Sequence, residues 1–587
     1  MISTPSLQPV PALAGVRPYR VPAAGAPVDL RLDANEGPVP SAAILHAIAA
    51  CNGDSARRYA TPALLEAALA NQLGVTPDRV LVTAGGDDVL DRACRAVLCP
   101  GRSAVLTAPT FEMIPRWAGL SGAHLVVTNW DRGGFPRDEI IASVREDTTM
   151  VAVVTPNNPT GAVATAEDIE AISAAAPHAL LVVDLAYTEF ADDDLTETVL
   201  RLPNAIAVRT FSKAWGLAGL RLGYALGPSP ILDWLRASGG PYPCSTASLA
   251  AGLAAVERGP DRAYIEAARA QRTELRELLT SLGCDAYDSQ ANFVLARAPD
   301  AVWLRDSLAG LGIAIRVYPD KLGLQDAVRI SCPGNEADLA RLTAALRAAL
   351  APEALLLDLD GVIADVSGSY RASIIQTCTA FGVTVDPSDI AAAKAGGNAN
   401  NDWVLTRSLL AARGVDVSQD EVTDRFEEIY QGVPDRPGLR ETETMIPSVD
   451  TVRALAERFP LAVVTGRPRR DAEYVLERFG IRDLFRHVVC MEDGPAKPDP
   501  TPVSVALDRL GVDRAWMVGD TVDDLRAARA ASVGDRAVVP LGVVPPGEKR
   551  ERSEPVLVAS GAGRVLKDLS DLIELAAPEA AVARSTP

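Results

Sequence analysis

The stretch Leu355–Val366, "LLLDLDGVIADV", joins a short apolar run to two aspartates, Asp358 and Asp360, that lie one residue apart. Residues two apart in a strand point to the same face of its sheet. Two carboxylates on one face at the end of a buried strand repel each other and lose hydration. The stretch therefore predicts a buried strand whose end holds a cationic ligand; the alternative is that the two acids only cap a turn.

Short apolar runs alternate with helical patterns along nearly the whole chain, before this stretch and after it. Such alternation is typical of an α/β protein with mostly parallel sheets, whose ligands bind beyond the carboxyl ends of the strands. We expect strands at the runs "VLVTAG" (80–85), "SAVLTAP" (103–109), "MVAVVTP" (150–156), "ALLVVDLAY" (179–187), "AIAVRTF" (205–211), "ALLLDLD" (354–360), "LAVVTGR" (461–467) and "AWMVGD" (515–520).

The length of 587 residues implies more than one domain. A helix is expected to end near Ala351–Pro352, and the apolar run of the opening stretch follows almost at once. We therefore divide the chain into residues 1–352, residues 353–575 and a frayed tail at 576–587. Because the join is short, the two domains are expected to lie close together. Within the second domain, "LGVVPPGEKRERSEP" (541–555) is expected to be a loop.

The composition excludes several classes of partner. A formal net charge of −19 argues against general binding to nucleic acid or to anionic membranes. The chain shows neither a signal-peptide pattern at its start nor an apolar run of membrane-spanning length. The eight cysteines form no metal-type spacing and suit a reducing compartment. We expect a soluble cytoplasmic protein that acts on small molecules.

Several polar motifs of the first domain follow expected strands. Lys213 lies in "TFSKAWGLAGLRLGY" (210–224), Asp184 ends an apolar run, and "TAGGDD" (83–88), "PTFEM" and "PNNPTG" end three others. A lysine amine can form a Schiff base, a buried carboxylate can pair with a pyridinium nitrogen, and a Gly-rich helix start can hold a phosphate. Together the motifs suit pyridoxal phosphate; the alternative is that all five are merely turns at strand ends.

These residues resemble a known family. Residues 1 to about 350 are similar to the fold-type I aminotransferases, and most similar to the histidinol-phosphate aminotransferases. The fold this implies has a large domain with a mostly parallel sheet and a small α/β domain. The resemblance rests on the motifs above and on "LDANEGP" (32–38), "RYATP" (58–62), "DLAYTEF" (184–190), "PYPCST" (241–246), "SQANFVLAR" (289–297), "GIAIR" (312–316) and "VRIS" (328–331).

The resemblance implies a role for each matching position. Lys213 would be the Schiff-base lysine and proton shuttle. The other cofactor-binding residues would be Gly86, Asp87, Phe111, Asn158, Asp184, Tyr187, Thr210, Ser212 and Arg221, with Tyr59 reaching the cofactor phosphate from a partner subunit. That last contact implies a homodimer. The substrate would be surrounded by Tyr19, Asn35, Asn292, Arg316 and Arg329. Two arginines that face one substrate suit a phosphate or carboxylate clamp.

Three motifs depart from the commoner pattern of the family. This sequence has "DLAY" where the family commonly has "DEAY", "TFEM" in place of "TYGM", and "TAGGDD" in place of a "GSDE"-like turn. None of these changes removes a catalytic group. Family members also accept aromatic amino acids, and close relatives decarboxylate phosphothreonine. The resemblance therefore leaves the identity of the substrate open.

The second domain supplies partners for Asp358 and Asp360. Thr465 ends one expected strand, Lys497 lies in the loop "EDGPAKPDP" (492–500), and Asp520 and Asp524 follow another strand. Carboxylates at strand ends suit Mg²⁺, a hard cation that takes oxygen ligands. A lysine and a hydroxyl beside them suit a phosphoryl group.

The order DxDG, TG, loop Lys and GDxxxD resembles the haloacid dehalogenase superfamily, over residues 353–575, and implies a Rossmann-like domain. The resemblance implies that Asp358 attacks phosphorus and that Asp360 acts as general acid and base. Mg²⁺ would be bound by Asp358, by the carbonyl of Asp360 and by Asp520, with Asp524 positioning Lys497 or a metal-bound water. Thr465 and Lys497 would bind the phosphoryl oxygens.

The residues between the first two motifs, 367–446, have a helical pattern and are expected to form a cap over the site. Within this cap, "GGNANNDW" (396–403) ends in Trp403. This segment either contacts the leaving group and selects it, or is a simple turn between helices. The sequence leaves both interpretations open.

The fusion suggests two consecutive reactions: amination of imidazole-acetol phosphate with glutamate as donor and 2-oxoglutarate as its product, then hydrolysis of histidinol phosphate to histidinol in histidine biosynthesis. A second hypothesis keeps both chemistries but assigns them to another phosphorylated or aromatic amino substrate. A third makes the C-terminal domain a non-catalytic regulatory module; the intact acids, Thr465 and Lys497 count against it.

Overall fold

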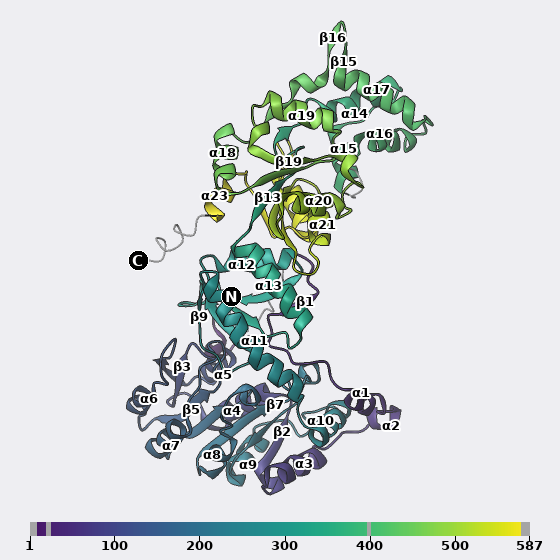
Figure 1. The fold of residues 1–587 in the computed structure, drawn as a ribbon. Coiled ribbons are helices and arrows are strands. Elements are labelled where there is room, and N and C mark those ends of the chain that lie inside the picture. Colours follow the sequence, from purple (N-terminus) through teal and green to yellow (C-terminus); the bar gives the residue numbers. More distant parts are fainter. Residues whose placement is uncertain (1–8, 19–24, 396–400, 577–587) are drawn as a thin grey trace, which may run out of the picture.

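The computed structural model describes residues 9–18, 25–395 and 401–576. Figure 1 shows an elongated molecule in which a large sheet domain, a smaller α/β domain and a second α/β body with a helical extension follow one another. The predicted α/β fold with parallel-rich sheets is confirmed. Among the described residues, no helix is both long and apolar enough to cross a bilayer.

The large domain is built on a seven-stranded sheet. Four adjacent pairs are parallel, but β8 runs antiparallel to both of its neighbours. In sheet order the strands are β2 (Val80–Thr83), β8 (Gly223–Leu226), β7 (Ala205–Thr210), β6 (Leu180–Asp184), β5 (Thr148–Val154), β3 (Ser103–Ala108) and β4 (His124–Asn129).

Both faces of this sheet are buried, which explains the continuous apolar runs in the sequence. On β5, Val151 and Val153 pack into one apolar cluster, whereas Met150 and Ala152 pack into another. The helices that supply these clusters and follow the strands include α3 (Ala63–Leu73), α4 (Gly86–Val97), α5 (Met113–Leu120), α6 (Arg137–Ser143), α7 (Ala166–Ala175), α8 (Thr196–Arg201), α9 (Ser229–Ala237) and α10 (Thr246–Arg258).

The small domain takes its strands from both ends of the first 350 residues. Its sheet order is β1 (Leu30–Leu32), β11 (Ile313–Val317), β12 (Ala327–Ser331), β10 (Phe293–Arg297) and β9 (Asp285–Ala286). Because β1 pairs in parallel with β11, the N-terminal segment passes beside the small domain before the chain enters the large one. The helices α11 (Arg262–Ser281), α12 (Ala301–Gly310) and α13 (Glu336–Leu350) belong to this part of the chain.

The second α/β body holds a six-stranded sheet that is parallel throughout. In sheet order its strands are β19 (Phe485–Val489), β18 (Leu461–Val464), β13 (Ala354–Leu357), β20 (Arg514–Gly519), β21 (Ala537–Val543) and β22 (Arg564–Leu566). Its helices are α18 (Val449–Arg458), α19 (Arg469–Arg478), α20 (Thr501–Leu510), α21 (Val522–Ala530), α22 (Arg550–Ala559) and α23 (Asp571–Leu575).

The predicted loop at 541–555 is wrong at both ends. Its first three residues belong to β21, and Arg550 begins α22, which continues past Pro555. Arg550 pairs with Glu554 one turn later (2.7 Å) and donates hydrogen bonds to the carbonyls of Val565 and Leu566. These tertiary contacts stabilise a helix that the prolines and charges of the segment do not indicate.

Among the described residues, four α-helices extend from the second body between two short strands. β14 (Ala364–Asp365) and β17 (Thr444–Met445) pair antiparallel at the base, so the chain leaves and re-enters the body at one point. The helices are α14 (Tyr370–Ala380), α15 (Pro387–Ala395), α16 (Asp402–Ala411) and α17 (Gln419–Gln431). Residues 396–400 of the segment "GGNANNDW" lie outside the described residues, as does the predicted tail from 577 onward.

The two bodies share one apolar core. Side chains of α12 and α13 pack in the same cluster as those of β13 and β20. At its centre Trp303 meets Trp516 edge-to-face, with ring centroids 5.1 Å apart. Each indole N–H donates to a carbonyl in the last turn of α13, that of Trp303 to Ala349 (3.1 Å) and that of Trp516 to Ala348 (2.8 Å).

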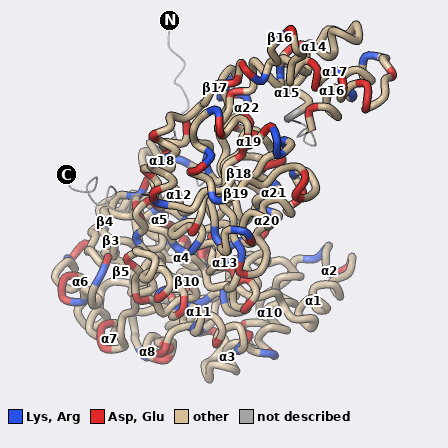
Figure 2. Tube along the Cα trace, turned by 45° about the horizontal axis from the view of Figure 1, so that its top comes forward, with Lys and Arg blue, Asp and Glu red and all other residues tan. Residues whose placement is uncertain are grey.

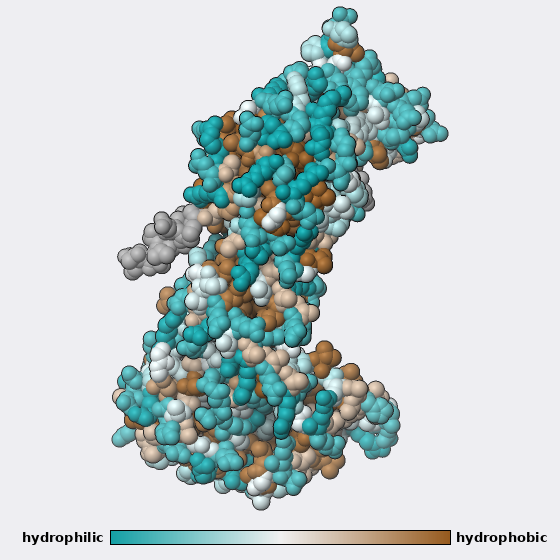
Figure 3. All heavy atoms as spheres, viewed as in Figure 1, coloured by the Kyte–Doolittle hydropathy of each residue, from teal (hydrophilic) through white to brown (hydrophobic). Residues whose placement is uncertain are grey.

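Polar contacts surround this shared core. Arg529 of α21 donates to the carbonyl of Pro27 (2.7 Å) and pairs with Asp29 (2.9 Å), just before β1. Figure 3 shows hydrophobic residues reaching the surface in small groups, some of them at the level where the bodies meet. Figure 2 shows acidic and basic residues intermixed along the chain.

Trp516 is fully buried, so Trp516→Ala is expected to lower the free energy of unfolding by about 3–5 kcal/mol through lost burial and a new cavity. Urea unfolding followed by far-UV circular dichroism measures the change. Trp234→Ala is the control, because Trp234 is 53% exposed, and it should change the midpoint only slightly. Equal shifts in the two variants would contradict a shared core.

Candidate active sites

A cavity of about 330 Å³ lies at the carboxyl ends of β5, β6 and β7, facing β11 and β12 of the small domain. It brings together most of the residues that the sequence predicted for the first site. Those that line it are Asn35, Gly86, Asp87, Phe111, Asn158, Asp184, Tyr187, Thr210, Ser212, Lys213, Arg221, Arg316 and Arg329.

Lys213 and Asp184 are the two central charges of this cavity. The Lys213 Nζ donates to the carbonyl of Ala34 (3.1 Å). Burial, and after it the charge of Arg329, lowers the pKa of Lys213 to about 8. Burial raises the pKa of Asp184 to about 7, although its carboxylate accepts the N–H of Ala186 (3.0 Å). A cationic ring nitrogen beside Asp184 would favour its ionised form.

One end of the cavity collects hydrogen-bond donors. It contains the N-terminus of α4, where Gly85 has φ +86° and a Cβ atom on it would lie 2.9 Å from the Arg221 guanidinium. Arg221 pairs with Asp87 (2.9 Å), and the Thr210 hydroxyl donates to Ser212 (2.9 Å). A helix N-terminus with a guanidinium and two hydroxyls fits a phosphate group.

The opposite wall is a hydrogen-bonded set around the Tyr187 hydroxyl. Asn35 and Asn158 donate to this hydroxyl at 3.0 and 3.4 Å. Arg329 donates to Asn158 (2.7 Å) and to the carbonyl of Asp33 (2.7 Å), while its buried Nε has no hydrogen-bond partner among the described residues. The set can therefore bind a further oxygen acceptor. The donors and acids of the cavity fit pyridoxal phosphate, with its phosphate at α4 and its ring nitrogen at Asp184.

Two predicted residues in the described part of the chain do not line the cavity. Tyr59 is 82% exposed and stacks on Tyr242, with centroids 4.5 Å apart. Asn292 is buried and donates to the carbonyl of Glu36 and the hydroxyl of Tyr264. Tyr19 lies outside the described residues.

Five charged residues that line the cavity were not predicted: Arg31, Asp33, Glu36, Glu112 and Lys321. Glu112 pairs with Lys321 (2.7 Å) and with Arg316 (3.4 Å), so the cavity carries a carboxylate beside its arginines. Glu112 stood in the unusual motif "TFEM", which was a usable signal. Lys321 had none, because only the turn after β11 brings it to the cavity.

The second site lies at the carboxyl end of β13. Lys497 is buried and its Nζ lies 2.8 Å from Asp358 and 2.5 Å from Asp524. It also donates to the carbonyl of Val464, the last residue of β18. The other oxygen of Asp524 accepts from the backbone and hydroxyl of Thr521 (3.0 and 2.6 Å). Asp524 therefore holds Lys497 in place, between β13 and α21.

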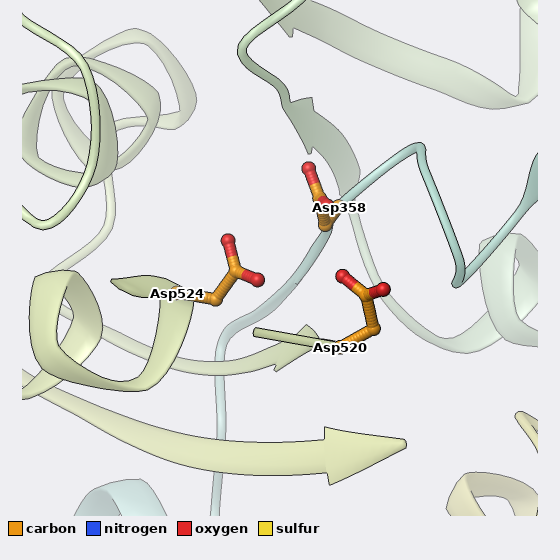
Figure 4. A group of neighbouring side chains, drawn as sticks. All are labelled: Asp358, Asp520 and Asp524. Carbon is orange, nitrogen blue, oxygen red and sulfur yellow. The ribbon is translucent and has the colours of Figure 1, made fainter. Parts of the chain in front are cut away.

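Figure 4 shows Asp358, Asp520 and Asp524 around one space, and their carboxylate oxygens lie within 4.8 Å of one another. Gly361 turns the chain beside them with φ +73°, and a Cβ atom there would lie 2.2 Å from Asp520. Oxygen donors at this spacing fit a hard divalent cation. Both oxygens of Asp524 already have partners, one in Lys497 and the other in Thr521.

Asp358 is itself buried. Burial raises its pKa to about 7, and the positive charge of Lys497 opposes that rise. A cation at Asp358 would favour the carboxylate further. Thr465, buried at the end of β18, lies on the neighbouring strand and its hydroxyl accepts the N–H of Arg467 (3.2 Å).

Asp360 is bound by a residue that the sequence analysis missed. Arg467 reaches Asp360 Oδ1 through Nε (2.6 Å) and through Nη2 (2.5 Å). Arg467 ended the quoted run "LAVVTGR", directly after the predicted Thr465, so the signal was present.

Comparison with known families agrees with this geometry. Residues 28–346 match the family model of aminotransferase class I and II, which is more than half of the chain. The chain therefore belongs to the class I and II aminotransferases. Residues 352–532 match the haloacid dehalogenase-like hydrolase model, so a hydrolase domain of that type is fused to the aminotransferase.

Two relatives carry more specific names than the family model of the first domain. A histidinol-phosphate aminotransferase of Roseiflexus castenholzii is 36% identical over 324 residues, 52% of this chain and 86% of that protein. The crystal structure of histidinol-phosphate aminotransferase from Sinorhizobium meliloti in complex with pyridoxal-5'-phosphate matches with TM-score 0.52 and 29% identity, over 60% of this chain and 99% of that one.

A third relative is of a different kind. An imidazoleglycerol-phosphate dehydratase of Phytophthora nicotianae is 49% identical over 187 residues, 30% of this chain. This chain spans less than half of that protein, 41% of its length.

Lys213 is expected to react as a neutral amine at lower pH than other lysines. With a pKa of about 8, half of its amine is neutral at that pH, whereas an ordinary lysine reaches that point at a pH of ~10.4. The rate of its acetylation by acetic anhydride in the cofactor-free protein, measured by peptide mass spectrometry, should rise with pH and level off above about pH 9. A lysine model peptide is the control; a Lys213 rate that rises in parallel with it up to about pH 10 would contradict the lowered pKa.

Proposed function

We propose that this chain catalyses two reactions in two domains. Residues 1–352 transfer an amino group between glutamate and a phosphorylated keto compound, and residues 353–575 hydrolyse the phosphate ester. The single observation that carries the proposal is the coexistence of two complete polar sites in one chain, one around Lys213 and one around Asp358. The cap at about 367–446 and the tail at 576–587 complete the proposed division.

In the first domain, pyridoxal phosphate would be held by the donors at α4, by Asp184 and by Lys213, with Phe111 against its ring. When bound, it supplies an electron sink for cleavage of a bond at the amino-bearing carbon. Lys213 then carries a proton at Nζ, for which a pKa near neutrality is suited. Arg316 and Arg329 orient the anionic substrate groups.

In the second domain, a carboxylate oxygen of Asp358 forms a bond to phosphorus, and the bond from phosphorus to the ester oxygen breaks. The electron pair stays on that oxygen, which takes a proton from Asp360 and leaves as an alcohol. Water, deprotonated by Asp360, then attacks the phosphorus and releases phosphate from Asp358. Mg²⁺ at Asp358 and Asp520 would neutralise the transferring group. Thr465 and Lys497 would bind its oxygens.

The substrate we propose is an imidazole-bearing amino phosphate ester, histidinol phosphate, made by the first site and dephosphorylated by the second. The names of the relatives, histidinol-phosphate aminotransferase and imidazoleglycerol-phosphate dehydratase, support an imidazole phosphate. This assigns the chain to histidine biosynthesis. Its eight free cysteines suit the reducing cytoplasm.

We further propose a homodimer in which Tyr59 serves the partner's cavity. Exposed aromatic side chains support this, since Tyr59 and Tyr242 stack on each other and are 82% and 49% exposed. Aromatic side chains are enriched at protein interfaces.

The two activities are expected to separate by mutation. Asp358→Asn should lower phosphate release by about 10³-fold or more, because an amide cannot attack phosphorus, while transamination continues. Lys213→Ala should do the reverse, and a chelator of divalent cations should act like Asp358→Asn. Assays with histidinol phosphate, for 2-oxoglutarate-dependent transamination and for phosphate release, measure both. Loss of both activities in either variant would contradict two independent sites.

Tyr59 and Lys213 are expected to act across the dimer. Tyr59→Ala and Lys213→Ala chains should each transaminate poorly. When the two are co-expressed, hybrid dimers hold one intact site, so about a quarter of wild-type activity should return. The purified single variants, mixed without subunit exchange, are the control. If co-expression restores nothing, Tyr59 does not act in the partner's site.

A further inference from the structure

We propose that Arg467 is a positioning residue of the phosphatase site, which holds the general acid Asp360 and ties its orientation to the base of the cap. The inference rests on the proposed phosphatase function. It concerns a residue with no part in the resemblance to known motifs.

On the core side, Arg467 grips Asp360 with two nitrogens. Its Nε and Nη2 lie 2.6 and 2.5 Å from the same oxygen, Oδ1. The Arg467 side chain is 1% exposed, while that of Asp360 is 26% exposed. The Nε–H donates a hydrogen bond and Nη2 adds a close ionic contact to the same oxygen, so a buried, planar guanidinium fixes where Oδ1 lies. Because both contacts fall on Oδ1, we assign the proton donation to Oδ2.

On the cap side, the same guanidinium binds residues at the foot of the cap. Its Nη1 lies 3.1 Å from Glu443 and donates to the Tyr430 hydroxyl (3.2 Å). The guanidinium lies over the Tyr370 ring, 4.7 Å from its centroid. Tyr370 begins the first cap helix, Tyr430 lies in the last turn of α17, and Glu443 precedes the strand that leaves the cap.

Glu443 makes this arrangement specific. Its side chain is fully buried and accepts from the hydroxyls of Ser369 (2.7 Å) and Tyr430 (3.1 Å) as well as from Arg467. Removing one partner of a buried ion pair leaves the other charge uncompensated, so Arg467 and Glu443 constrain each other. Asp360 is therefore held in place only while the two entry points of the cap, near 369 and 443, are seated on Arg467.

This constraint matters in one bond-breaking step. As Asp358 bonds to phosphorus, the electron pair of the breaking ester bond goes to the leaving oxygen, and the Asp360 proton must reach that oxygen. An alkoxide leaving group depends on this proton. A nitrophenolate does not, because it is already a stable anion. A misplaced Asp360 thus slows alkyl esters far more than aryl esters.

The test compares kcat/KM for two esters in the full-length enzyme with Mg²⁺: histidinol phosphate, an alkyl ester, and p-nitrophenyl phosphate. For each ester, kcat/KM reports only the steps up to departure of the leaving group. The later hydrolysis of the phosphorylated enzyme, which is common to both esters, does not contribute to kcat/KM. Arg467→Met should lower it about 10²–10³-fold for the alkyl ester and less than about 10-fold for the aryl ester. Asp360→Asn should give the same pattern, and the double variant no further loss.

Two further variants keep the test decisive if Arg467→Met unfolds. Arg467→Lys keeps the charge but not the planar grip, and Glu443→Gln removes only the anchor in the cap; both should show the same preference for the aryl ester, to a smaller degree. Arg486→Met, on an exposed arginine of β19, is the matched control and should change neither ester.

An equal fall for the two esters in folded variants would assign Arg467 a purely structural role and overturn the proposal. An unchanged kcat/KM for both would also overturn it. If the wild-type enzyme hydrolyses neither ester, the proposed phosphatase function itself fails, and this inference fails with it.

Discussion

The buried junction between α13 and β13 is the constraint on which the rest of the structure depends. Three residues separate the helix from the strand. Beside this junction, the rings of Trp303 and Trp516 pack against each other. Because a close-packed apolar core resists rearrangement, β13 is held in one position and one orientation. Asp358 lies at the end of this strand. The phosphatase site is thus built on the same core that supports the small domain, rather than on a flexible tether.

Both sites also solve the same electrostatic problem. Parallel strands bring their carboxyl ends to one edge, where acids are needed for chemistry but are costly to bury. In the second site Lys497 offsets Asp358 and Asp524, while Arg467 offsets Asp360 and Glu443. In the first, Asp184 has a pKa near 7 without a partner of this kind, which suits a site completed by a cationic ring.

The strands and the residues in their first turns were predictable, because hydrophobic period and strand-end motifs are local signals. β5, β6, β13 and β20 were located, and so was the set around Lys213. Strand β8 and its antiparallel direction were not, because the four residues "GYAL" are a short run that carries no signal of strand direction. Helix α22 was missed, since its stability comes from Arg550 contacts with β22. Lys321 was missed as a site residue because its partner Glu112 is distant in the sequence, whereas Glu112 and Arg467 stood in quoted motifs whose roles only the structure shows.

The sequence by itself determined the class of the two domains and most of the polar groups that the structure brings together, because each rests on residues within a few positions of one another. Tertiary structure alone decided which of those groups meet. The tertiary structure left Tyr59 exposed, placed the Asn292 amide against the carbonyl of Glu36, and set Arg467 between Asp360 and the cap. The reason is that contacts between distant segments depend on the packing of the shared core, and no local pattern encodes the distance between two strand ends.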